Sequence, residues 1–242
     1  MQGLYGKGEL HAALQAAQAA LALCEQIGEA RLATWLDPMA AIIAVDLGDD
    51  ESARMHAQRA LERARQLNQL VLSAWALHAQ GYIALRRGDT RTALEWYEQY
   101  VALVCDTENG VARHLVMARA AEAYFLSGRL DDAARLTERA IADATFADAP
   151  HYLALARRVQ GQILGAQKRY DEAMSAFDEA IAAFTATGSR LELARTMYRR
   201  AALRFELGDR DAARTDVANA RDEFEAIEAV RDRAMAEVVL SK

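Results

Sequence analysis

The sequence predicts an all-α fold, an α-solenoid built from stacked helix-turn-helix repeats. Three observations lead to this prediction. The composition favours helix, because alanine is abundant and the 242 residues include only two prolines and thirteen glycines. A short turn motif, usually beginning with glycine, recurs every 40 residues. Small residues recur at fixed distances before and after each turn, where the two helices of a hairpin must approach closely.

The turn motif fixes the register of the repeats. It occurs six times, beginning at Gly8, Gly48, Gly88, Gly128, Lys168 and Gly208. Five residues later there is always an alanine, at Ala13, Ala53, Ala93, Ala133, Ala173 and Ala213. Seven residues further on a small residue returns in every copy except the third, which has Tyr100. Seven residues before the later turns the small residues are Ala41, Gly81, Ala121, Gly161 and Ala201.

This register predicts twelve helices, each ended by a turn. They are expected at residues 9–26, 30–47, 50–66, 70–87, 90–106, 111–127, 130–145, 151–167, 170–187, 190–207, 210–227 and 230–240. The turns between repeats contain Gly28, Asn68, Asn109-Gly110, Asp148 to Pro150, and Gly188, which suit helix ends. Pro38 lies inside the second helix and removes a backbone donor, so we expect either a kink near Asp37 or a helix that begins there.

A turn glycine flanked by small residues in this pattern resembles the tetratricopeptide repeat. The clearest copies run from Gly81 through Gly88 to Tyr97, and from Gly161 through Tyr170 to Ala180. The resemblance covers almost the whole chain and implies a right-handed solenoid whose first helices line a concave face. The period of 40 residues exceeds the usual value of about 34, and HEAT-type repeats share this greater length. The Gly-Asp turn and the following alanine favour the tetratricopeptide interpretation.

The repeats account for the whole chain, so we expect residues 1–242 to form a single solenoid. In this register the first repeat is incomplete, and residues 230–240 form a partial capping helix. Because solenoids normally need capping elements at both ends, we expect a fragment of a larger protein, or ends that a partner or self-association covers.

Composition argues against several classes of function. The net charge of −6 does not provide the basic field of a general nucleic-acid binder. The chain has neither a long apolar run for a membrane span nor the apolar core of a signal peptide, so we expect a cytoplasmic protein. Cys24 and Cys105 fall about two repeats apart, too far for a disulfide.

No chemical motif points to catalysis. The histidines lack metal-ligand spacing, at His11, His56, His78, His114 and His151. No nucleophile elbow and no phosphate-binding glycine loop is present. The paired carboxylates Asp131-Asp132 and Asp171-Glu172 stand at helix starts, where the helix dipole favours negative charge. We therefore expect neither enzymatic activity nor a metal or cofactor.

The predicted concave face offers a candidate binding groove. One stripe of the first helices is aromatic toward the N-terminus and rich in arginine toward the C-terminus, comprising Trp35, Trp75, His78, Tyr82, Arg86, Arg119, Glu122, Arg158, Gln162, Arg195, Tyr198 and Arg199. Aromatic and arginine side chains dominate binding hot spots. The stripe therefore predicts a partner with apolar and acidic parts, such as a peptide or a helix of another protein. The alternative is structural: adjacent repeats bury the stripe, and its arginines pair with Glu122, Glu192 and Glu206.

The last repeats carry a second resemblance. Residues Thr187 to Thr196, followed by Leu207-Gly208-Asp209, resemble the C-terminal sensor arrays of bacterial signal-transducing ATPases, including maltose-regulator-type activators. This implies an interaction or sensor region of a bacterial regulatory protein. Two functions stay open: a scaffold that binds protein or peptide, and a module of a transcription regulator that senses a small inducer. An open groove would favour the first, and a closed pocket with convergent polar groups the second.

Overall fold

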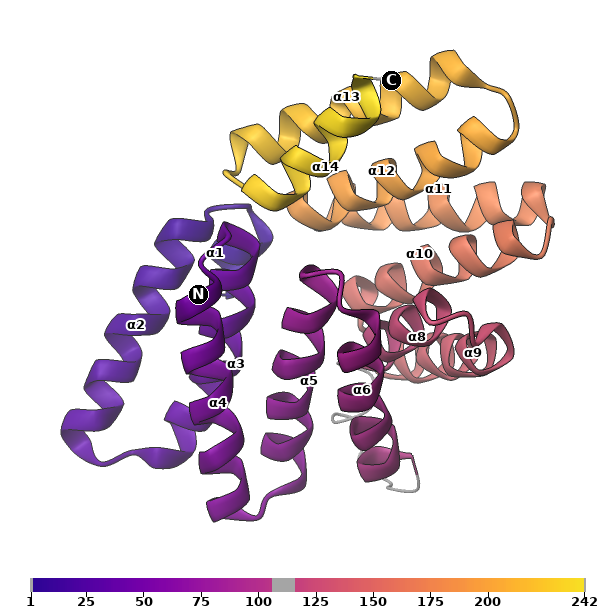
Figure 1. The fold of residues 1–242 in the computed structure, drawn as a ribbon. Coiled ribbons are helices and arrows are strands. Elements are labelled where there is room, and N and C mark those ends of the chain that lie inside the picture. The colour runs from indigo at the N-terminus through magenta and orange to yellow at the C-terminus, as the bar shows by residue number, and fades with distance from the viewer. Residues whose placement is uncertain (1, 106–115, 242) are drawn as a thin grey trace.

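Helices in consecutive antiparallel pairs build the molecule (Figure 1). The computed structural model describes residues 2–105 and 116–241, and within them it contains helices and turns but no strand. The helices are α1 Gln2–Gly6, α2 Leu10–Ile27, α3 Ala30–Leu47, α4 Asp50–Leu67, α5 Leu70–Arg86, α6 Thr90–Val104, α8 Met117–Leu126, α9 Leu130–Phe146, α10 Pro150–Ala166, α11 Tyr170–Ala186, α12 Arg190–Glu206, α13 Arg210–Ala226 and α14 Val230–Leu240.

The predicted helices are confirmed, with bounds that agree within two residues for every helix that is described in full. The exception is α8, which begins at Met117, whereas we expected a helix from 111. Its predicted start, the turn at Asn109-Gly110 and His114 lie outside the described residues. The expectation that a helix begins near Asp37 is wrong, because α3 begins at Ala30, where the Glu29 carboxylate accepts the backbone N–H of Arg31 at 3.2 Å.

The Gly-Asp turn both ends one helix and begins the next. Gly48 has a φ of +86°, a left-handed conformation that glycine adopts without steric cost. The carboxylate of the following Asp49 accepts the backbone N–H of Ser52 at 3.0 Å, which caps α4. Asp89 caps α6 through Thr92 in the same way, at 3.0 Å. Thus two adjacent residues set the 40-residue register that the sequence shows.

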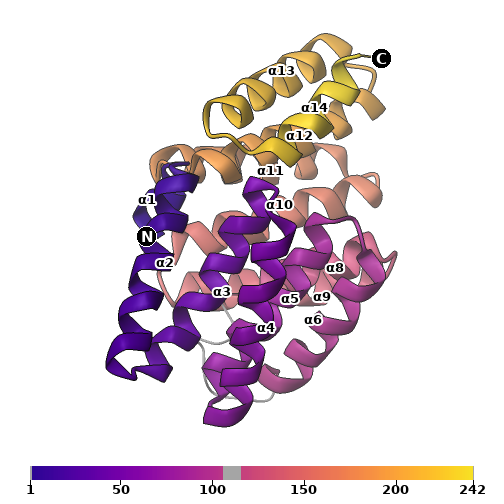
Figure 2. The same cartoon turned by 60° about the vertical axis from the view of Figure 1, so that its left-hand side comes forward.

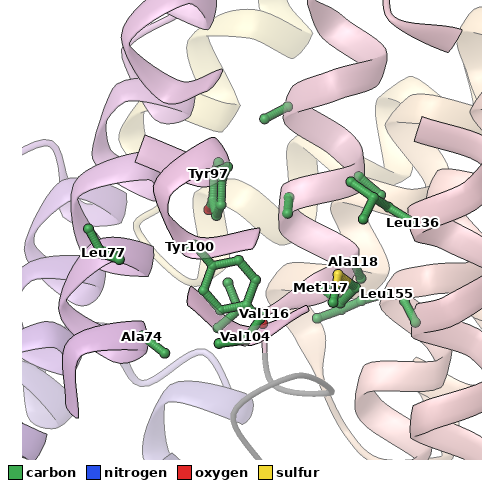
Figure 3. Packing of buried hydrophobic residues seen from close by; sticks show 14 of the residues in the cluster. Ala74, Leu77, Tyr97, Tyr100, Val104, Val116, Met117, Ala118, Leu136 and Leu155 are labelled. Atoms are coloured by element: carbon green, nitrogen blue, oxygen red, sulfur yellow. The ribbon is translucent and has the colours of Figure 1, made fainter. Parts of the chain in front are cut away.

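The small residues before the turns are contact points within hairpins. A Cβ atom added at Gly81 of α5 would lie 2.7 Å from the Tyr97 ring of α6, and one at Gly161 of α10 would lie 3.0 Å from the Phe177 ring of α11. Glycine in the first helix thus accommodates an aromatic ring from the second. Figure 3 shows Tyr97 and the neighbouring Tyr100 between α5 and α8, where Tyr100 fills the place that small residues hold in the other repeats.

The solenoid curls until its two ends meet (Figures 1 and 2). Leu10 and Ile43 share a buried apolar cluster with Val217, Phe224 and Ile227 of the last repeats. A Cβ atom added at Gly8 would lie 2.4 Å from Cγ2 of Ile227, so these two turns are in direct contact. Arg231 of α14 also reaches Asp50 of α4 at 2.8 Å. The inner face of the array is therefore enclosed on this side.

None of the described helices combines the length and apolar character that crossing a bilayer requires.

Candidate functional site

Ionised side chains fill the centre of the array. Four arginines and four carboxylates from the first helices meet there, and we call them the inner charge cluster: Asp46, Arg86, Arg119, Glu122, Arg158, Glu192, Arg195 and Asp232. They come from α3, α5, α8, α10, α12 and α14. Equal numbers of positive and negative groups make the cluster neutral overall, which reduces the cost of burying its charges.

Arg195 is the centre of one half of this cluster. Its Nη2 lies 2.6 Å from Asp46 Oδ1 and 2.8 Å from Asp232 Oδ2. Its Nη1 donates to the Tyr82 hydroxyl at 2.7 Å, and that hydroxyl lies 3.0 Å from both oxygens of Asp46. Arg86 also contacts Asp46 and Asp232. This half therefore joins α3 and α5 of the early repeats to α12 and α14 of the late ones.

Glu192 is the centre of the other half. Its Oε1 accepts from Arg119 at 2.7 Å and from Arg195 at 3.0 Å, and its Oε2 accepts from Arg158 at 2.6 Å. Arg119 also donates to Glu122 at 3.1 Å. Both oxygens of Glu192 are thus satisfied by guanidinium groups, which leaves little capacity to bind a further cation.

The arginines keep the buried carboxylates ionised. Burial alone would raise the pKa of Glu122, but Arg158, Arg119 and Arg199 outweigh it and lower that pKa to about 2. Burial likewise opposes the ionisation of Asp232, whose pKa Arg195 and Arg86 lower to about 2. The pKa of Glu192 falls well below its ordinary value for the same reason.

A cavity of about 430 Å³ lies beside this cluster on the inner face. Trp75, His78 and Tyr82 of α5 line it together with residues of α3, α10 and α12. The N-terminal segment borders it through Gly3, Tyr5, Gly6 and Lys7. The Tyr5 hydroxyl donates to Asp46 at 2.8 Å, which ties this segment to the inner charge cluster.

Both histidines of the cavity are uncharged near neutral pH. Burial, assisted by Arg119, lowers the pKa of His78 to about 3. Its Nδ1 lies 3.0 Å from the Tyr97 hydroxyl. Burial also lowers the pKa of His151, whose Nδ1 lies 3.2 Å from the Ser189 hydroxyl. The cavity therefore offers aromatic surface with a few polar groups, as ligand pockets do.

The structure distributes the predicted groove residues over several places on the inner face. Trp75, His78, Tyr82 and Arg119 line the cavity. Arg86, Glu122, Arg158 and Arg195 belong to the inner charge cluster, and Tyr198 and Arg199 line a small space beside it. Gln162 lies further along, and Trp35 packs edge-on against Trp75 at 5.9 Å between ring centroids. Four arginines of the stripe, Arg119, Arg158, Arg195 and Arg199, pair with Glu122 or Glu192, as the structural alternative supposed. Arg86 pairs instead with Asp46 and Asp232.

Sequence reasoning missed Asp46, Asp232 and Tyr5. Asp46 and Asp232 look like ordinary polar residues in their repeats. Asp46 pairs with Arg86 and Asp232 with Arg195 in a neighbouring repeat, and the meeting of the two ends adds the pairs Arg195–Asp46 and Arg86–Asp232. Tyr5 lies in a segment that the repeat pattern does not cover completely. No signal in one sequence marks such contacts between distant repeats.

Neither cysteine forms a disulfide. Among residues 2–105 and 116–241 no group of three or more potential metal ligands comes together.

Comparison with known families identifies the repeats. Models of the tetratricopeptide repeat match residues 31–106 and 159–184. These matches favour the tetratricopeptide interpretation of the 40-residue period over HEAT-type repeats. No curated protein matches the sequence.

Solved structures share the fold. A Rap protein complexed with competence and sporulation factor superposes with a TM-score of 0.76 at 19% identity, over 93% of this chain and 61% of that one. BtubC from P. vanneervenii gives 0.60 at 18% identity, over 90% of this chain and 92% of that one. A signal transduction ATPase with numerous domains from Pyrococcus horikoshii, which has a tetratricopeptide repeat sensor, gives 0.55 at 11% identity, over 86% of this chain and 36% of that one.

This chain therefore spans about three fifths of the Rap protein and about a third of the ATPase. The likeness to the ATPase supports, at the level of fold, the resemblance to sensor arrays noted in the sequence. The 40-residue turn register, the paired helices and the matching repeat models lead to one conclusion: the chain contains tetratricopeptide repeats and folds as a tetratricopeptide-like solenoid.

Proposed function

We propose that this protein is a non-catalytic binding module that receives a compact ligand inside the array, as the sensor region of a regulatory protein. The observation that supports the proposal is the cavity of about 430 Å³ beside the inner charge cluster. Pockets for small ligands typically have volumes of about 300–1,000 Å³ and are mostly apolar with a few directed polar groups. This cavity has those properties.

A compact ligand in this partly open cavity accounts for the site better than an extended partner along the whole stripe. The turn of Gly8 touches Ile227, so the early and late repeats meet beside the cavity. The inner arginines are already paired with buried carboxylates, for example Arg158 with Glu192 at 2.6 Å. Releasing such an arginine for an acidic partner would leave a buried carboxylate unpaired, which is costly. We therefore propose the cavity, and not the whole stripe, as the binding site.

A short peptide is the second candidate. The Rap protein that shares this fold over 93% of the present chain was solved with competence and sporulation factor bound. A peptide could place one end in the cavity and leave the remainder outside. The expected partner with apolar and acidic parts stays compatible with this mode, because the apolar part would enter the aromatic cavity.

Filling the cavity provides the test. A Cβ atom at Gly6 meets no heavy atom within 4 Å, so a Gly6→Phe ring enters open space. Leu155→Trp fills the cavity from α10. A library of metabolites and short peptides is screened by thermal shift against the wild type and both variants, and circular dichroism verifies that the variants fold. The proposal requires compounds that stabilise only the wild type. It fails if every stabilising compound acts equally on all three proteins.

A further inference from the structure

We infer that the cavity selects a flat aromatic ligand that carries one anionic group, such as a carboxylate. This inference rests on the proposed function, because it assigns the ligand chemistry of the same cavity. It follows from the shape of the apolar lining and from the polar groups that remain unpaired.

The lining offers flat apolar surface. The rings of Trp75 and His78 are stacked, with centroids 5.3 Å apart and planes inclined by 14°. Tyr82 continues this surface along α5, with its ring 5.7 Å from His78. Met39, Ile42 and Leu155 provide aliphatic contacts. A planar ring system buries more area against such walls than a branched ligand of equal size, and aromatic contacts add to that burial.

Trp75 supplies a hydrogen-bond donor without a partner. The side chain is 6% exposed, and its buried Nε1 has no hydrogen-bond partner among the described residues. A buried donor left unpaired costs free energy, so native structures usually satisfy it. Trp75 lines the cavity, so a small turn of the indole would bring this N–H to an oxygen of a bound ligand, and we infer that ligand binding includes that turn.

The one carboxylate among the lining residues is already occupied. Glu192 accepts three hydrogen bonds from arginines. The Tyr82 hydroxyl accepts from Arg195 and donates to Asp46, so it is occupied as well. A cationic ligand would therefore find no free carboxylate in the lining.

The charges of the lining also favour an anion. Arg119 and Glu192 of the lining are paired with each other, and Arg119 is also paired with Glu122, so Lys7 supplies the remaining charge of the lining, which is positive. His78 and His151 add none at neutral pH, because burial lowers the pKa of each. Lys7 lies at the cavity on the N-terminal segment, and within the described residues no carboxylate forms a salt bridge with it. Its ammonium group is thus available to an anionic ligand.

Two sources can supply this chemistry. One is a free aromatic acid, and the other is the C-terminal carboxylate of a peptide that ends in an aromatic residue. Binding is therefore measured by isothermal titration calorimetry with two matched pairs. The first pair is 2-naphthoate and 2-naphthamide, and the second is Ala-Ala-Phe with a free acid or an amidated C-terminus.

Two variants separate the two recognition groups. Lys7→Gln should weaken binding of the acid by about threefold to fivefold and leave the amide unchanged, because the cation is partly exposed. Trp75→Phe keeps a ring but removes the donor, so it should weaken both acid and amide by about fivefold. Two variants outside the cavity serve as controls. Lys168→Gln removes a positive charge as Lys7→Gln does, and Trp96→Phe replaces an indole as Trp75→Phe does. Both control variants should bind the probes like the wild type.

The outcomes separate a failure of the inferred ligand chemistry from a failure of the proposed function, which is ligand binding in the cavity. Preference for the acid in either pair, reduced by Lys7→Gln, supports the inference, and the responsive pair identifies the source. Equal binding of acid and amide, no effect of Lys7→Gln, or no binding by any probe overturns it. If the probes bind Gly6→Phe and Leu155→Trp as tightly as the wild type, they do not occupy the cavity, and the proposed function fails as well. If those variants lose binding while acid and amide bind equally, only the ligand chemistry is wrong.

Discussion

Arg195 of α12 and Asp46 of α3 are 149 positions apart in the sequence, yet Arg195 Nη2 lies 2.6 Å from Asp46 Oδ1. Both side chains are buried, with 8% and 0% exposure. Helix α3 lies in an early repeat and α12 in a late one. The contact between Arg195 and Asp46 therefore forms only when the early and late repeats come together. Its loss affects both the stability of the fold and the geometry of the cavity.

Arg195→Met should lower the free energy of unfolding by about 3–5 kcal/mol, because it removes one of the two arginines that the buried carboxylates Asp46 and Asp232 share and leaves only Arg86 for both. Urea denaturation followed by circular dichroism measures this. Adding Asp46→Asn to Arg195→Met should cost less than the sum of the two single changes, because the carboxylate that lost its partner is then neutral. Strict additivity would show that the two side chains do not interact. The exposed Arg91 serves as a control, and Arg91→Met should have no measurable effect.

Gly8→Ala tests the contact between the two ends. Gly8 and Gly48 both have positive φ, so alanine should cost about 1–2 kcal/mol at either position. Only at Gly8 does the new Cβ meet Ile227, at 2.4 Å from Cγ2, whereas at Gly48 it meets nothing within 4 Å. We expect Gly8→Ala to cost about 1–3 kcal/mol more than Gly48→Ala through overpacking. Because leucine lacks the Cβ methyl group, Ile227→Leu should recover part of that difference. Equal losses at Gly8 and Gly48 would contradict the contact.

Gly81→Ala tests the packing within a hairpin. Helix propensity alone would favour alanine by about 0.5–1 kcal/mol. The Tyr97 ring, 2.7 Å from the new Cβ, should reverse the sign and give a net loss of about 1–3 kcal/mol in thermal or chemical unfolding. Gly3→Ala in α1 meets nothing within 4 Å, and should be neutral or slightly stabilising. A Gly81→Ala protein as stable as the wild type would show that Tyr97 moves freely.

His78 should make the protein less stable in mild acid. Its pKa of about 3 in the folded state lies below the ordinary value of 6.5, so the unfolded chain binds a proton first. The stability is therefore fully present above pH 6.5 and declines as the pH falls toward 3. Between pH 7 and pH 5 the loss should be about 2 kcal/mol. His151, whose pKa is also lowered, acts in the same direction.

Urea denaturation at pH 7, 6 and 5 measures this effect. His78→Gln should flatten the pH dependence, whereas His11→Gln, on the exposed surface of α2, should retain it. Glu122 and Asp232 contribute little in this window, because carboxylates with a pKa near 2 lose their stabilising effect only at lower pH. An unchanged slope in His78→Gln would exclude His78 as the source.

The helices and their packing within hairpins could be predicted because they depend on neighbouring residues. Gly48 and Asp49 end one helix and begin the next within a few residues. Gly81 and Tyr97 are 16 positions apart and meet inside one hairpin. The candidate site could be predicted only in part. Trp75, His78 and Tyr82 were assigned to the concave face, where they line a cavity.

The sequence alone determined the all-α fold, the 40-residue register and the tetratricopeptide character of the repeats, because each is encoded by local turns and regularly spaced small residues. Only the tertiary structure decided that the ends of the array meet, that its arginines pair with Asp46, Glu192 and Asp232, and that a partly open cavity lies beside them. The curvature of a solenoid accumulates from small rotations between repeats. Contacts across its interior therefore depend on the sum of all repeats, which no single segment of the sequence reveals.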